Sequence, residues 1–157
     1  MSQGLRSSRA DGLLTWLTIH HRGQQFDDFR LPAYWFRVNF YESTEHVKAY
    51  RRRRLKDTPE KDLGAAVIWR NDTVPLNGFL GTLIIAQDWL SPRVLIHESV
   101  HLAVRATKVE VGADRLVISN GSKGVDNEET LAYLTDGIAS ALIEHLSEYM
   151  EDSSGPK

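Results

Sequence analysis

The residues best suited to chemistry are His97, Glu98 and His101, which lie in the apolar run VLIHESVHLA at 94–103. On a helix, side chains four residues apart share a face with about 5 to 6 Å between their Cβ atoms, so both imidazoles can reach one metal ion. Glu98 is about 100° further around, where its carboxylate can touch a metal-bound water. Zinc lowers the pKa of such a water towards about 7, and a neighbouring carboxylate then removes its proton as the water attacks a polarised carbonyl. The three residues therefore predict a zinc hydrolase with Glu98 as general base.

The same pattern can arise by chance on an ordinary helix, so its context matters. Ser91 and Pro92 precede it as an N-cap residue and a proline at the first helical position, which predicts a helix from about Pro92 to about Lys108. The neighbours of the histidines are mainly valine, leucine, isoleucine and alanine. Unpartnered histidines are costly to bury among such side chains, and this favours a ligand role.

A catalytic zinc site needs a third protein ligand. The metzincin pattern is excluded, because Val104 and Thr107 stand where it has glycine and histidine. The next acidic cluster opens a second predicted helix, from near Asp126 to near Tyr149, with apolar residues at three- and four-residue steps. These are Leu131, Leu134, Ile138, Leu142 and Leu146.

Two carboxylates of this second helix compete for the ligand role, Glu128 and Glu129. We favour Glu129, because it shares a face with Tyr133 and Asp136, whereas Glu128 lies on the side of Ala132. Either residue could instead be a first-turn acid that stabilises the helix dipole.

With IHESVHLA followed by NEETLAYLTD, the chain resembles the gluzincins and the small minigluzincins, including metallopeptidase-like proteins encoded by bacteriophages. The resemblance covers roughly residues 78–146. It implies that one zinc ion is bound by His97, His101 and Glu129, that Glu98 is the general base and that Asp136 orients a ligand histidine. It also implies a peptide substrate, held by strand addition along an edge strand at 81–87.

The gluzincin pattern also calls for a group that stabilises the oxyanion of the tetrahedral intermediate. Tyr133 and His145 are the nearest candidates, and we take Tyr133 as the catalytic one. His145 is expected to be a surface or helix-end residue.

Composition sets the broader class of the protein. The chain has 157 residues, 41% of them hydrophobic and 25% charged, with 19 basic against 21 acidic residues. It contains no cysteine, so a metal must use His, Asp or Glu ligands. No apolar run approaches the roughly 20 residues of a membrane span. We expect a cytoplasmic protein that binds neither membrane nor nucleic acid, and we interpret the four arginines at 51–54 as part of a solvated helix.

The remaining pattern predicts one α+β domain over residues 1–157, with flexible ends at 1–10 and 151–157. A short antiparallel or mixed sheet would pack on the two helices of a small zincin-like fold. The predicted strands cover 33–41, 65–70 and 81–87, a helix covers 45–55, and the segment 13–19 fits a helix or a strand. We expect a turn-rich connection at 71–78 and a linker over the cleft at 117–127.

Two functions follow from these predictions. The first is a zinc peptidase in which Glu98 activates water. The second is a non-catalytic zincin-like module that keeps zinc and binds a protein partner.

Overall fold

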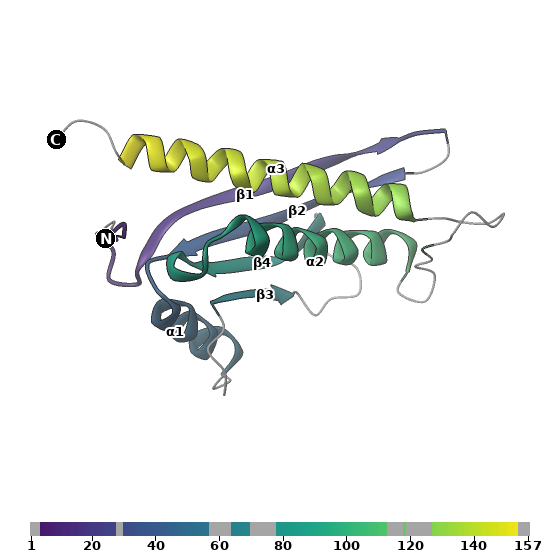
Figure 1. Cartoon of the computed structure of the whole chain (residues 1–157). Helices are drawn as coiled ribbons and strands as arrows, with labels where there is room; N and C mark the ends of the chain where they lie inside the picture. The colour runs from purple at the N-terminus through teal and green to yellow at the C-terminus, as the bar shows by residue number, and fades with distance from the viewer. Residues whose placement is uncertain are drawn as a thin grey trace.

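The fold of the chain is given by a computed structural model, which describes residues 4–27, 30–56, 64–69, 78–112, 118 and 127–153. The described residues form four strands, three α-helices and a short 3-10 helix, and Figure 1 labels the strands and the α-helices. Their bounds are β1 Leu13–Gln25, β2 Arg30–Tyr41, α1 Thr44–Leu55, β3 Ala65–Trp69, β4 Phe79–Ala86, η2 Gln87–Trp89, α2 Pro92–Val111 and α3 Glu128–Ser153. The structure thus confirms the predicted strands and helices, and it resolves the open segment 13–19 as part of β1. The predicted connection at 71–78 and linker at 117–127 lie almost wholly outside the described residues.

The four strands form one mixed sheet in the order β1-β2-β4-β3. β2 and β4 are parallel, and α1 and β3 lie between them in the chain, whereas β1 with β2 and β3 with β4 are antiparallel. The α+β prediction with a mixed sheet is therefore confirmed.

The prediction that the strand at 81–87 is an edge strand was wrong. β4 lies between β2 and β3, and its residues Leu83 to Ala86 are buried on both faces of the sheet. An apolar run such as LIIA is typical of a central strand, because both faces of such a strand are covered. The described edge strand on this side is β3, all five residues of which are partly exposed.

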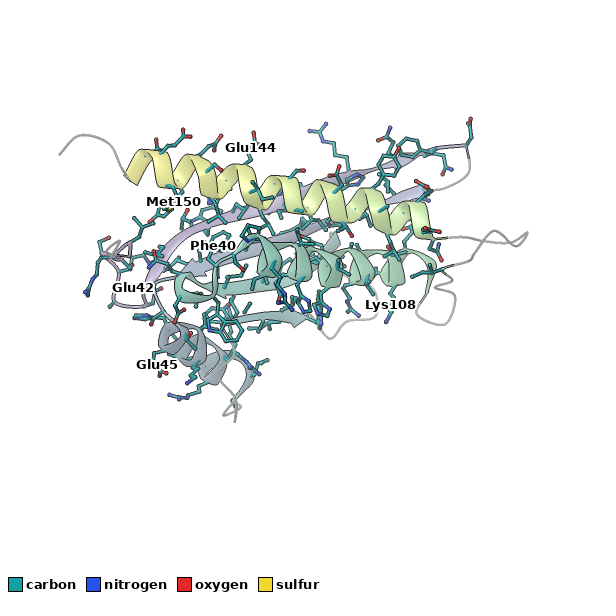
Figure 2. All side chains as sticks on the ribbon, in the orientation of Figure 1. Phe40, Glu42, Glu45, Lys108, Glu144 and Met150 are labelled. Carbon is teal, nitrogen blue, oxygen red and sulfur yellow. The ribbon has the colours of Figure 1, made fainter. Side chains whose placement is uncertain are left out.

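Helices cover both faces of the sheet. α2 and α3 lie side by side on one face (Figure 1), where Phe36, Val38 and Leu83 pack against Leu102 and Ile138 in the larger core. Phe40 of β2, labelled in Figure 2, belongs to the same core. On the opposite face α1 places Val47 over a smaller cluster of Leu13, Tyr41, Ile84 and Ala86.

The two long helices begin much as their sequences predict. The Ser91 side chain accepts a hydrogen bond of 3.3 Å from the backbone N–H of Val94, and Pro92 is the first residue of α2. α3 begins directly after Asn127, and its predicted apolar face is confirmed, because Leu134, Ile138, Leu142 and Leu146 are buried and Leu131 is partly buried.

Parts of the two end segments that were predicted to be flexible, residues 4–10 and 151–153, are among the described residues. Gln87 exchanges two hydrogen bonds with the backbone of Leu5, and Ser7 donates its backbone N–H to Glu42. At the other end, α3 continues to Ser153. Of the helices in the described residues, none is long and apolar enough to cross a membrane.

Candidate functional site

The two motif histidines come together on one exposed face of α2. The Nε2 atoms of His97 and His101 lie 3.1 Å apart, and their rings are nearly perpendicular at 81°. Both side chains are exposed, so the pair is open to solvent on the side of α2 that faces β3. The predicted proximity of the two histidines is confirmed.

The spacing of the two Nε2 atoms fits a shared metal ion. Two nitrogen ligands at about 2.0 to 2.1 Å from a tetrahedral zinc lie roughly 3.3 Å apart. The same distance would also serve a hydrogen bond between the two rings, in which one nitrogen donates and the other accepts. His97 and His101 thus supply two suitable donors for zinc.

Glu98 lies beside the pair but in a different environment. Its side chain is buried, with 7% exposure, yet it lines the same cleft as the two histidines. Within the described residues no hydrogen bond reaches its carboxylate. Burial raises the pKa of Glu98 above its ordinary value, and the charges of His101 and His97 oppose this shift. A buried carboxylate with these neighbours is suited to accept a proton.

The cleft between α2 and β3 has a volume of about 440 Å³. Its walls are mainly apolar: β3 contributes Ala65, Ala66, Val67 and Trp69, α2 contributes Val94, and Trp89 stands at the end of η2. Ala65 is the smallest of the β3 side chains on the α2 side of the sheet, so it leaves room in the cleft.

The position of Trp89 depends on Gly64. A Cβ atom added to Gly64 would overlap the Trp89 ring, so the ring packs directly on the glycine backbone. The Gly64 carbonyl also accepts a hydrogen bond of 2.6 Å from the backbone N–H of Ala86, which joins the start of β3 to β4. Gly64 therefore sets one wall of the cleft.

The predicted third ligand does not join the histidines. α3 runs antiparallel to α2 (Figure 1), and its first turn lies at the far end of α2, where Thr130 bonds the Arg30 carbonyl and Arg30 pairs with Glu110. The nine residues from His101 to Glu110 span roughly 13 Å of helix axis. Glu128 and Glu129 are both exposed there. Among the described residues, no three His, Asp, Glu or Cys side chains are grouped so that they could hold a metal.

The other predicted site residues on α3 also lie away from the cleft. Tyr133 stacks on Phe26 with 5.6 Å between ring centroids and lines a separate pocket between α3 and β1. His145, predicted to be a surface or helix-end residue, is half-buried, and its Nε2 lies 3.0 Å from Thr15 Oγ1. Asp136 is exposed, and no hydrogen bond or ion pair among the described residues joins it to either motif histidine.

The chain was compared with protein-family models, with curated proteins and with solved structures. It matches none of them. The function must therefore be inferred from the site itself.

Sequence reasoning missed the residues that form the cleft walls. Ala65, Ala66 and Trp69 belong to a strand that was predicted, but its place opposite α2 depends on pairing with β4. The small side chain of Ala65 was the available signal, because a strand that borders an open cleft needs little volume on that side.

Proposed function

We propose that this protein is a zinc-dependent peptidase of the zincin type. The observation that carries the proposal is the arrangement in one cleft of an exposed histidine pair, with Nε2 atoms 3.1 Å apart, and the buried carboxylate of Glu98. Among the described residues the Glu98 carboxylate has no hydrogen-bond partner. Burial of such a carboxylate costs stability, so its retention there supports a chemical role.

His97 and His101 would hold the zinc ion through their Nε2 atoms. When bound, zinc supplies a Lewis acid that polarises a substrate carbonyl and acidifies water. The proposal requires only these two protein ligands. The sequence-based prediction of Glu129 as the third ligand, on which the finer assignment to the gluzincins depends, is left to substitution experiments.

Glu98 would act as general base and then as general acid. Its carboxylate takes a proton from the attacking water as the water oxygen bonds to the peptide carbonyl carbon. The carbon–nitrogen bond then breaks, and the proton passes from Glu98 to the leaving amine. The raised pKa suits this role, because a base works best when its pKa lies closer to the working pH.

β3 would hold the substrate in place of the predicted strand at 81–87. In the part of the chain that the structure describes, β3 pairs with β4 alone, so its outer edge offers backbone donors and acceptors to an extended peptide. The apolar lining of the cleft favours an apolar side chain next to the scissile bond. A cytoplasmic setting is part of the proposal, because the cysteine-free chain suits a reducing compartment.

Metal analysis combined with peptide cleavage tests this function. We expect one zinc ion per chain and cleavage of peptides from an unbiased library. Glu98→Gln should keep the zinc content and lose cleavage, whereas the exposed control Glu148→Gln should change neither. Equal cleavage by Glu98→Gln and the unsubstituted protein would refute the proposed mechanism.

The second candidate is a non-catalytic zinc-binding module that captures a protein partner in the same cleft. It is favoured by the position of Glu129, since, among the described residues, the histidine pair has no third protein ligand nearby and is then a weaker site for catalysis. This candidate predicts bound zinc but no cleavage by any variant, so the same experiment separates the two functions.

A further inference from the structure

We propose that Arg105 is a specificity-determining residue that binds a substrate carboxylate at one end of the cleft. This inference rests on the proposed function, because it assigns a substrate feature to the same cleft. It comes from the placement of Arg105 relative to three residues of the site: His97, His101 and Trp69.

Arg105 continues the row of the two histidines along α2. His97, His101 and Arg105 follow one another at four-residue steps, which keeps successive side chains on neighbouring parts of one helix face. Four residues advance an α-helix by about 6 Å, and an extended peptide advances about 3.3 Å per residue. The Arg105 position therefore corresponds to a substrate residue about two places from the scissile bond.

Contact with Trp69 holds the Arg105 guanidinium on the β3 side of α2. The guanidinium carbon lies 5.5 Å from the centroid of the Trp69 ring, which is within the range of a cation–π interaction. Trp69 is the last residue of β3 and lines the same cleft as His97, Glu98 and His101. Arg105 is half-buried, so less side-chain entropy is lost when it binds a ligand.

The charge of Arg105 sets the chemistry that it would select. The cleft is lined mainly by alanine, valine and tryptophan, and the guanidinium stands at the Trp69 end. A planar guanidinium bonds a carboxylate through two parallel N–H donors, and such charge-assisted bonds are stronger than neutral ones. The carboxylate could belong to an acidic side chain or to the C-terminus of the substrate, and both present the same group.

Peptide binding to the Glu98→Gln protein, which we expect not to cleave, distinguishes an acidic side chain from a C-terminal carboxylate. The probes are fluorescein-labelled octapeptide pools with an amidated C-terminus and one Glu at each position in turn, and the same pools with Gln. A second pair lacks acidic residues and ends in a free carboxylate or an amide. Fluorescence anisotropy is measured with Glu98→Gln protein, both with zinc and without added metal, so that the result does not require catalysis.

We expect one carboxylate pool to bind about tenfold more tightly than its neutral counterpart. Arg105→Gln should remove this preference, and Arg105→Met should do the same while its apolar stem still packs on Trp69. Arg93→Gln, which removes an exposed arginine at the start of α2, should keep the preference. Thermal unfolding identifies any variant that fails to fold. If one of the two Arg105 variants does not fold, the other one tests the inference.

Two results would overturn the inference. One is equal binding of the charged and neutral pools by the Glu98→Gln protein that retains Arg105. The other is a carboxylate preference that survives Arg105→Met or Arg105→Gln. Failure of the peptidase proposal has a different signature. In that case the unsubstituted protein cleaves no peptide, whereas the carboxylate preference and its dependence on Arg105 can still be measured.

Discussion

Gly64 and Trp89 are in direct contact, because the indole ring occupies the space that a side chain on residue 64 would need. The contact joins the start of β3 to the end of η2, and Trp89 forms one wall of the cleft beside the motif helix. The shape of the candidate site thus depends on a residue that carries no chemistry.

Gly64→Ala should lower the free energy of unfolding by about 1 to 3 kcal/mol, because the added methyl group must displace the ring or the backbone. Chemical denaturation measures the change. Gly137→Ala is the matched control, since a Cβ atom there meets nothing within 4 Å and the helix interior gains up to about 1 kcal/mol. When Trp89→Ala is already present, adding Gly64→Ala should lower the free energy of unfolding only slightly. An equal loss with and without Trp89→Ala would show that the added methyl group does not clash with the Trp89 ring.

The zinc ligands can be separated by affinity measurements. His97→Ala and His101→Ala should each weaken zinc binding by about 100-fold or more, because each removes one of two adjacent donors. Since Glu128 and Glu129 lie together at the other end of α2, we expect Glu129→Ala to weaken binding no more than Glu128→Ala. Competition with a chromogenic chelator gives the affinities. A loss of zinc affinity in Glu129→Ala but not in Glu128→Ala would instead establish Glu129 as the ligand that the sequence predicts.

Glu98 should make the stability of the chelator-treated protein depend on pH. Its pKa is raised in the folded state, so the folded protein holds the proton more tightly than the unfolded chain and loses stability as the pH rises. The loss begins near the unfolded pKa of about 4.3 and continues up to the raised pKa of the folded state. Across this window the free energy of unfolding falls by about 1.4 kcal/mol for each unit of pH. Glu98→Gln removes this ionisation.

The expected result is that the unfolding free energies of Glu98→Gln and the unsubstituted protein converge near pH 4. Above that pH the variant should become the more stable, because the unsubstituted protein loses stability as Glu98 ionises and the variant does not. Urea denaturation across the pH range measures the difference. A constant difference at every pH would mean that the Glu98 carboxyl does not titrate abnormally.

The cap of α2 should contribute to the stability of the motif helix. Ser91→Ala removes the side-chain acceptor for the Val94 N–H and should lower the free energy of unfolding by about 1 kcal/mol. Ser147→Ala, at an exposed position of α3, should change it by less than about 0.5 kcal/mol. Indistinguishable denaturation midpoints for the two variants would contradict the assigned cap.

Local signals in the sequence predicted the elements well. The Ser91-Pro92 start of α2 and the apolar face of α3 are properties of neighbouring residues, and both are found in the structure. The His97–His101 contact was predictable for the same reason, because helical periodicity alone brings the two side chains together.

The arrangement of those elements was not predictable in the same way. Strand order depends on the parallel pairing of β2 with β4, which the long connection through α1 and β3 permits but does not dictate. The distance from His101 to Glu129 depends on how far α2 extends before the chain turns back, and α2 ends at Val111 rather than near Lys108. Tyr133 likewise faces Phe26, which directly follows β1, and periodicity along α3 alone does not specify that neighbour.

The most direct test of the central claim is mass spectrometry of an unbiased peptide library incubated with the zinc-loaded protein in ¹⁸O-labelled water. The account predicts new peptides with one ¹⁸O atom in each newly formed C-terminal carboxylate, and no such products with zinc-loaded Glu98→Gln. An absence of labelled products with the unsubstituted protein, or equal labelling by the two proteins, would contradict it.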